Sequence, residues 1–311
     1  MHAGHRLHGI TLPRHPGPRR RPPPPAKPGD PPPTYRLSPW LRAGTGPAIH
    51  ANRLHPDPKE MFMNSPRPVR SFEQWYASLP KVTPRYLAGN HGCYGTPGLA
   101  PLEEAGWPHL ADELGTSRYF AADGRRCVTF RPDEQHLLEC ALHPLWEAWA
   151  RPDGLRSPAW IAQFTTDTPP EIIGGFTAAL AADHTTPQGT PHYLTSPGEH
   201  EHALHPLAAA GWQPAHRAEQ WGFRAPDRQA EAHYRPAHER RHPFEELRCG
   251  PVWIIAAQPR TSPFALWRAT LTSATPAHLI AAFLTALAEP TGLPRDPDDL
   301  PDTLRDHLTL T

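Results

Sequence analysis

The chain has 311 residues and no formal net charge, and its 44 prolines and mean hydropathy of -0.60 indicate that part of it does not pack into a core. No apolar run approaches the roughly 20 residues that a membrane-spanning helix needs, and no hydrophobic stretch follows the start as in a secretory signal. The four cysteines show no C-x-x-C spacing, which argues against a zinc site or a disulfide framework and favours reduced thiols in the cytoplasm.

Residues 1–60 are rich in proline and arginine and lack hydrophobic periodicity, so we expect a disordered arm. Its most basic part is Arg19, Arg20 and Arg21. Residues 1–80 hold twelve Lys and Arg against four Asp and Glu, so the remaining 231 residues carry a balance of -8. A basic arm suits an acidic partner such as nucleic acid. The alternatives are a solvated tail, or an over-extended gene start with translation beginning at Met61 or Met63.

Residues 84–289 contain two copies of one sequence unit, offset by about 107 residues. The segment Pro-Arg-Tyr-Leu at residues 84–87 returns as Pro-His-Tyr-Leu at residues 191–194. We therefore divide this part of the chain into repeat 1 and repeat 2, with a linker and short packing segment before them and an acidic tail after them. The boundaries are 61–83 for the linker, 84–183 for repeat 1, 191–289 for repeat 2 and 290–311 for the tail.

Both repeats predict the same order of elements: a short helix ending at a glycine, four strands, and an alanine-rich closing helix. In repeat 1 the helices are expected at residues 99–106 and 169–182, and the strands at 118–121, 127–131, 146–150 and 159–165. In repeat 2 the helices are expected at 204–211 and 276–288, and the strands at 220–224, 229–235, 252–257 and 266–272. The predicted fold class is α+β, with two four-stranded antiparallel sheets each followed by a helix. This element order is similar to that of the PUR-repeat and whirly proteins.

The last strand and closing helix of each repeat carry the clearest packing pattern. Apolar residues alternate with polar ones along the strand, which predicts one face on the helix and one free polar face. The helix-facing positions are Trp160, Ala162 and Phe164 in repeat 1, and Trp267, Ala269 and Leu271 in repeat 2. Thr168 and Glu171 have the spacing of a capping box at the start of the first closing helix. Small residues at 174–175 and 281–282 predict close backbone packing.

The repeated pieces resemble the SPDY domain, or domain of unknown function 317, a family of streptomycete proteins. The resemblance covers about residues 84–289. It rests on the opening Pro-Arg-Tyr-Leu-Ala-Gly, on the Ala-Gly-Trp at Trp107 and Trp212, and on the strand-to-helix passages after Trp160 and Trp267. Of the name-giving Ser-Pro-Asp, only the turn aspartates Asp123 and Asp227 remain, and we interpret them as hairpin geometry. The resemblance implies a repeated fold unit and an actinomycete origin, and it implies no established activity.

The sequence contains no nucleotide-binding loop, serine nucleophile elbow or zinc-protease motif. The densest histidine sets have no counterpart in the other repeat, so we expect no metal site. These sets are His200, His202 and His205 with Glu201, and His238 with His242. The adjacent acidic pairs at residues 103–104 and 112–113 are typical of a solvated surface. We expect no cofactor and no catalytic centre, so the chain is interpreted as a protein that is not an enzyme.

Trp149 has the opposite strand orientation to Trp146, which places it on the predicted free face. The candidate binding face is Arg131, Trp149, Gln163 and Arg268, with Arg19, Arg20 and Arg21 as the candidate basic arm. An aromatic side chain beside arginines can stack on the bases of a single strand; the alternative is cross-strand packing or an interface between the repeats. The leading hypothesis is binding of single-stranded DNA or RNA, and the alternative is a protein–protein interaction adaptor using the same faces. Repeat 1 has seven basic against thirteen acidic residues, which weighs against the first hypothesis.

Overall fold

The computed structural model describes most of the chain beyond residue 70. The described residues are 71–90, 95–113, 115–132, 144–152, 157–182, 191–194, 200–215, 220–236, 241–249 and 252–311. Several sequence-based predictions lie outside these ranges, namely those for the arm at residues 1–60 with Arg19, Arg20 and Arg21, for the alternative starts Met61 and Met63, and for His238.

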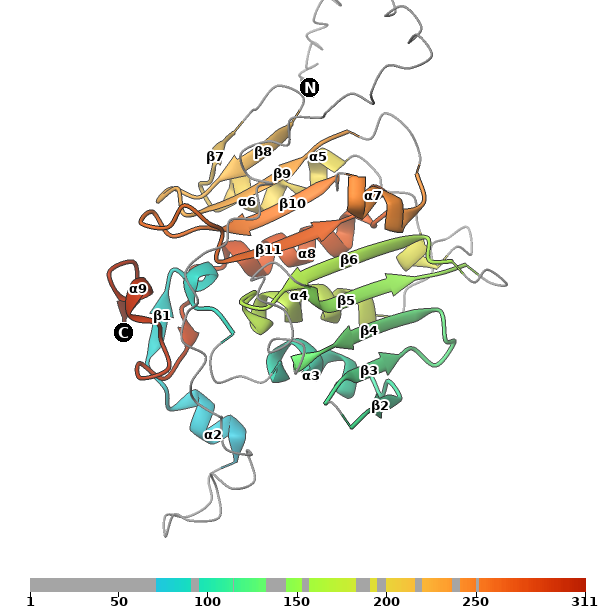
Figure 1. Ribbon diagram of the computed structural model, residues 1–311, viewed down its shortest axis with the longest axis horizontal. Coiled ribbons are helices and arrows are strands. Elements are labelled where there is room, and N and C mark those ends of the chain that lie inside the picture. Colours follow the sequence, from blue (N-terminus) through green and yellow to red (C-terminus); the bar gives the residue numbers. More distant parts are fainter. Residues whose placement is uncertain are drawn as a thin grey trace, which may run out of the picture. The chain divides into compact units, whose positions relative to one another are not determined.

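The two repeats share one antiparallel sheet of ten strands (Figure 1). Repeat 1 supplies β2 (His109–Ala111), β3 (Ser117–Phe120), β4 (Arg126–Phe130), β5 (Pro144–Ala150) and β6 (Trp160–Thr165). Repeat 2 supplies β7 (Gln213–Pro214), β8 (Trp221–Arg224), β9 (Ala230–Tyr234), β10 (Trp253–Ala257) and β11 (Trp267–Leu271). The order is β2-β3-β4-β5-β6-β11-β10-β9-β8-β7, so the last strands of the repeats pair at the centre. In that pair Gln163 lies opposite Thr270.

Each repeat contributes five strands, so the prediction of two separate four-stranded sheets is corrected on both counts. All eight predicted strands are present, with ends within two residues of the expected ones. The additional strands are β2 and β7, at the two edges of the sheet. All of their residues are exposed, so they show no alternation of buried and exposed positions, and sequence periodicity cannot detect them.

The helices that close the repeats pack on one side of the sheet. The larger helices are α3 (Thr96–Glu104), α4 (Pro170–Ala181) and α8 (Ala277–Ala288); α3 packs on α4, and α4 packs on α8. The shorter ones are α2 (Phe72–Ala77), α5 (His200–Ala203), α6 (His205–Ala209), α7 (Pro243–Cys249) and α9 (Asp302–Arg305), with 3-10 turns η2 (Arg85–Leu87) and η4 (His192–Leu194). Figure 1 shows α4 and α8 behind the sheet and α7 in front of it. Among the described helices, none has both the length and the apolar character needed to cross a membrane.

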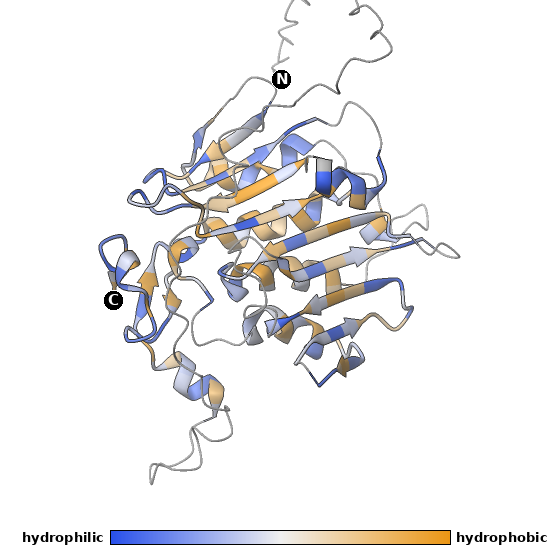
Figure 2. Cartoon of the chain, in the orientation of Figure 1, coloured by the Kyte–Doolittle hydropathy of each residue, from blue (hydrophilic) through white to orange (hydrophobic). Residues whose placement is uncertain are grey.

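The core lies between the sheet and the helices behind it. Trp160 and Trp267 are fully buried there, as the alternation predicts. Phe164 of repeat 1 stacks on Phe283 of repeat 2 with ring centroids 5.2 Å apart, so the two repeats share one continuous core. Figure 2 shows hydrophobic residues along β10 and in the helices behind the sheet.

Two adjacent glycines allow α4 to approach both of its neighbouring helices closely. A Cβ atom on Gly174 would lie 2.7 Å from the carbonyl oxygen of Pro97 in α3. A Cβ atom on Gly175 would lie 2.6 Å from the Cβ of Ala286 in α8. Both distances are shorter than atoms can tolerate, so the predicted close packing at residues 174–175 is confirmed.

The opening segments of the repeats are exchanged. Trp160 of repeat 1 donates its indole N–H to the carbonyl of Tyr193 at 2.8 Å, and Trp267 of repeat 2 donates to the carbonyl of Tyr86 at 2.7 Å. Each repeat therefore binds the opening segment of the other one. This exchange explains why Pro-x-Tyr-Leu and the strand tryptophan occur together in both copies.

The segments that flank the repeats meet in a second, three-stranded sheet. Its order is β12-β1-β13, with β1 (Lys81–Thr83) between β12 (Leu293–Pro294) and β13 (Thr309–Leu310). A small separate cluster of buried residues supports it, formed by Val82, Ala88, Leu293 and Leu300. Strand β1, which precedes both repeats in the sequence, therefore pairs with β12 and β13, which follow them.

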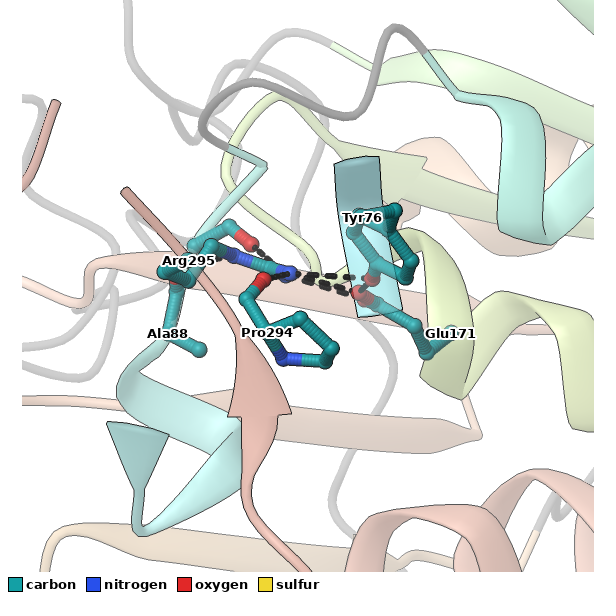
Figure 3. Close-up of polar contacts among 6 residues, drawn as sticks. Tyr76, Ala88, Glu171, Pro294 and Arg295 are labelled. Atoms are coloured by element: carbon teal, nitrogen blue, oxygen red, sulfur yellow. Dashed lines mark hydrogen bonds and ion pairs between the residues drawn. The ribbon is translucent and has the colours of Figure 1, made fainter. Parts of the chain in front are cut away.

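A buried arginine joins this small sheet to repeat 1 (Figure 3). The Arg295 side chain has no exposed surface, and its Nε and Nη2 donate to the carbonyls of Ala88 (3.0 Å) and Gly89 (2.7 Å). Nη1 and Nη2 also contact the two carboxylate oxygens of Glu171 at 2.5 and 2.9 Å, and Tyr76 donates its hydroxyl to the same carboxylate. Burial favours a raised pKa for Glu171, but Arg295 and these hydrogen bonds hold the pKa below its ordinary value.

The predicted capping box of Thr168 and Glu171 is not formed, so that prediction was wrong. Pro169 takes the cap position of α4, and the Thr168 hydroxyl has no hydrogen-bond partner within the described part of the chain. The Glu171 carboxylate turns to Arg295, a partner 124 positions later that local sequence spacing cannot indicate.

Candidate binding face

The candidate site is the face of the ten-stranded sheet that points away from α4 and α8, here called the front face. Its residues alternate with the core residues along each strand. In the middle of the sheet, the strand register aligns Thr129, Glu147, Gln163 and Thr270 in one row across β4, β5, β6 and β11. The face thus runs without interruption from repeat 1 into repeat 2.

Two of the four candidate residues meet at one carboxylate. Gln163 donates from Nε2 to Oε2 of Glu147 at 3.1 Å, and Nη2 of Arg131 lies 3.9 Å from Oε1 of the same group. All three side chains are partly exposed. The sequence analysis did not identify Glu147 as the group that connects these two candidates.

Trp149 follows two residues after Glu147 on β5 and lies on the same face. Its ring is partly exposed, and the guanidinium of Arg151 lies over it at 5.4 Å from the centroid. Across the sheet, Trp149 pairs with Cys127 on one side and with Ile161 on the other. One face of the indole is occupied by a cation, which leaves a partly exposed aromatic surface beside it.

The fourth candidate, Arg268, lies on β11 in repeat 2. Its backbone N–H bonds to the hydroxyl of Thr165 on β6 at 2.8 Å. The register of β11 with β6 places the Arg268 side chain on the same face as Gln163 and Arg131. The strands β5 and β6 lie between Arg131 and Arg268. The structure brings Arg131 and Gln163 together and places Trp149 and Arg268 on the two sides of them.

Repeat 2 adds a polar cluster that the sequence analysis did not single out. Glu231 on β9 bonds Arg224 on β8 at 3.1 Å, and Nε2 of His233 lies 3.1 Å from the same carboxylate oxygen. His233 is buried, and a Cβ on the neighbouring Gly222 would lie 2.6 Å from its ring. Alternation alone could have found these residues, because Glu231 and His233 are polar residues on a strand with buried alanines between them.

The front face is less free than the sequence pattern predicts. Cys127, Thr129 and Ile161 lie on it and are buried, and burial raises the pKa of the Cys127 thiol to about 11. Helix α7 contacts β6 on this side and is fixed by Glu246, which accepts hydrogen bonds from the backbone N–H and the hydroxyl of Ser273. Because burial outweighs these bonds, the pKa of Glu246 is raised. The expectation of one entirely free polar face is therefore corrected.

Positive charge nevertheless dominates the strands of this face. The arginines that alternation places there are Arg118, Arg131, Arg151, Arg224, Arg235 and Arg268, and the acids are Glu147 and Glu231. Three other acids of repeat 1 have partners elsewhere in the fold: Glu103 accepts from Tyr119, Asp123 accepts from Tyr193, and Glu171 pairs with Arg295. These three carboxylates therefore do not lie among the arginines of the front face.

The turn aspartates of the two repeats have a second role beside hairpin geometry. Asp123 and Asp227 each accept the backbone N–H two residues later, at 2.9 and 3.0 Å, which confirms the hairpin interpretation. Asp123 also accepts the hydroxyl of Tyr193 at 2.8 Å, and Asp227 accepts that of Tyr86. Burial, together with these bonds, raises the pKa of both tyrosines, that of Tyr193 to about 12. Each aspartate therefore also fixes the exchanged segment.

No group of three or more potential metal ligands is found within the described ranges. The ring of His200 lies tilted against that of Tyr234, with centroids 4.4 Å apart, and burial lowers the pKa of His200. His202 lies 4.9 Å from His205 between ring centroids. Burial raises the pKa of Asp167, in the turn before α4, to about 6, with no charged neighbour contributing. These groups are placed singly or in pairs.

The chain matches one family model. Residues 122–187 and 224–293 each match the SPDY domain, a domain of unknown function also called DUF317. The two matches begin at the turn that carries Asp123 or Asp227 and cover the last three strands and the closing helix of each repeat. No curated protein and no solved structure matches the chain.

Proposed function

We propose that this chain, which carries two SPDY domains, is a non-enzymatic protein that binds single-stranded nucleic acid across the front face, assisted by its basic arm. The observation that carries the proposal is the excess of arginine along the strands of that face, where six arginines stand against Glu147 and Glu231. Single strands bind to positively charged surfaces that also offer aromatic rings for stacking.

The strongest objection from the sequence was the acidic composition of repeat 1. Three of the thirteen acids count less against the proposal, because Glu103, Asp123 and Glu171 bind other groups of the fold and do not lie on the front face. Partly exposed Trp149 supplies a stacking surface between Arg131 and the arginine over its ring. The PUR-repeat and whirly proteins, which bind single strands, offer an analogy of element order; five strands per repeat make that analogy looser.

One observation favours a protein-interaction adaptor as the second candidate. Phe244 on α7 has 49% of its surface exposed, and α7 lies on the same side of the sheet as the candidate residues. An exposed aromatic beside a partly polar surface is typical of the centre of a protein interface. The two candidates therefore compete for the same side of the molecule.

The test measures fluorescence anisotropy of labelled single-stranded oligonucleotides with the full chain over a range of salt concentrations. The double variant R131Q/R268Q should bind about tenfold more weakly and show a salt slope smaller by one to two. The matched control is R305Q, because Arg305 is 55% exposed, forms an ion pair with Asp302 three residues before it and lies on α9, outside the ten-stranded sheet. It should bind as the wild type does.

A second variant tests the basic arm. Replacing Arg19, Arg20 and Arg21 by glutamine should lower the affinity for all nucleic acids equally, because contacts to phosphates carry no sequence information. Absence of binding at low salt to any DNA or RNA would reject the nucleic-acid function. In that event the adaptor would stand, and F244S should then abolish capture of its protein partner.

A further inference from the structure

The front face is divided into three parallel rows that cross the strands. Residues on one face of a strand are two positions apart, which is about 6.6–6.8 Å. The first row includes the arginines Arg131, Arg268 and Arg224, with Thr165, Ala256 and Glu231 at other positions of the same row. The middle row holds Arg118, Thr129, Glu147 and Gln163 in repeat 1 and continues through Thr270 and Ile254 in repeat 2. The third holds the aromatic residues Phe120 and Trp149, with Cys127 between them.

We infer that these rows are arranged for a ribose-containing strand, so that the ligand of the front face is RNA and not DNA. The inference rests on the proposed function and specifies its substrate. The arginine row binds phosphates, the aromatic row stacks on bases, and the middle row faces the sugars that join them. In repeat 1 the middle row is polar and contains a carboxylate, Glu147. That carboxylate can accept a hydrogen bond from a 2′-hydroxyl group, which the sugar of DNA lacks.

Glu147 is a group that attracts RNA and repels DNA at this position. Its carboxylate is 19% exposed and receives Nε2 of Gln163 at 3.1 Å, while Arg131 remains 3.9 Å away. An ionised carboxylate has about four acceptor positions, so it can accept a further hydrogen bond. The ribose 2′-hydroxyl is a donor at that place, and it is the group by which proteins distinguish RNA from DNA.

The repeats differ in this respect, which provides an internal control. Glu231 is also a partly buried carboxylate on the front face, but the register places it in the arginine row, beside Arg224 and opposite Ala256. There it faces phosphates, so it weakens the binding of RNA and DNA alike. Glu147 and Glu231 should therefore respond differently to the same substitution.

The experiment compares three ten-nucleotide ligands that differ only at the 2′ position: oligouridine, oligodeoxyuridine and 2′-O-methyl oligouridine. The full chain should bind oligouridine about tenfold more tightly than oligodeoxyuridine, the factor expected for one hydrogen bond to a charged acceptor. The 2′-O-methyl ligand retains the 2′ oxygen but has no hydrogen on it to donate, so it should bind like the deoxy ligand.

Two variants then assign the preference to a residue. E147L should reduce the ratio of RNA to DNA affinity to about one, whereas E231L should raise both affinities and leave the ratio unchanged. Thermal unfolding checks that both variants are folded, and E147Q, which retains an acceptor oxygen without the charge, should keep an intermediate ratio. Equal affinity for the three ligands in the wild-type chain would overturn the inference while leaving single-strand binding intact. Tight binding of the 2′-O-methyl ligand, or an unchanged ratio in E147L, would overturn it as well.

Discussion

The two repeats hold each other's opening tyrosine in equivalent places, but they surround it differently. In repeat 1, Tyr193 lies beneath the guanidinium of buried Arg126, 4.5 Å from the ring centroid. In repeat 2, Tyr86 packs edge-on against Trp212 with centroids 5.9 Å apart, and Ala230 stands where Arg126 stands in repeat 1. The tryptophan–carbonyl bond is common to both places and is a feature of the fold. The guanidinium that lies over the tyrosine ring is a feature of the place around Tyr193.

The closing helices show the same division between shared and individual features. Both begin after a Thr-Pro and bury the same apolar face. At the second helical position repeat 1 has Glu171, which binds Arg295, and repeat 2 has His278, which stacks on His192 at 3.7 Å between ring centroids. Helix α4 is therefore fixed to the terminal sheet, and α8 to the opening segment of its own repeat.

The largest effect is expected where the repeats are alike. W160A and W267A should each lower the free energy of unfolding by about 3–5 kcal/mol, because each removes a fully buried aromatic and its bond to the exchanged segment. Urea unfolding measures both values, which should agree within about 1 kcal/mol. A variant with wild-type stability would show that its tryptophan is not part of the shared core.

A comparably large effect is expected at the buried ion pair between Arg295 and Glu171, which links repeat 1 to the three-stranded sheet. R295M leaves Glu171 buried without its cation and should cost about 3–5 kcal/mol at neutral pH. Because the folded pKa of Glu171 is lowered, its contribution is complete above the ordinary value of 4.5 and is lost as the pH falls below it. The difference between wild type and R295M should therefore shrink on acidification.

Chemical unfolding at several pH values between 7 and 3.5 tests this dependence. The control is R305M, which removes an exposed arginine from the same terminal region and should change stability by less than about 0.5 kcal/mol. A difference between wild type and R295M that stays constant across this range would contradict the assigned ion pair.

The shared features were accessible to sequence reasoning because they repeat. The alternation around Trp160 and Trp267 predicted the buried face, and the alanine-rich segments predicted α4 and α8. The two edge strands were not predictable, since two or three exposed residues carry no pattern. The role of Arg295 could not be predicted either, because Glu171 and Gly89 lie more than one hundred residues away from it in the sequence. This ion pair has no equivalent in the sequence of repeat 2 that a comparison of the copies could reveal.

The candidate face was predictable in its members but not in its arrangement. Period-two alternation placed Arg131, Trp149, Gln163 and Arg268 on one side of the sheet. Which of them meet depends on the strand register, and on the pairing of β6 with β11, which joins the repeats. The role of Glu147 and the covering of this face by α7 follow from that register and not from local sequence.

The smallest predicted effect compares the two tyrosine hydroxyls directly. Y193F removes the hydrogen bond to Asp123, and Y86F removes that to Asp227, and each should cost about 1 kcal/mol. Both aspartates keep their backbone N–H partners, so neither carboxylate loses all of its hydrogen bonds. The ring of Tyr193 also keeps its contact with Arg126 in the variant, which confines the change to the hydroxyl. Because the two tyrosines belong to separate places, the double variant should show the sum of the single effects within about 0.5 kcal/mol, as measured by urea unfolding. A clearly larger loss would mean that the two exchanged segments are released together, and that the two places form one cooperative unit.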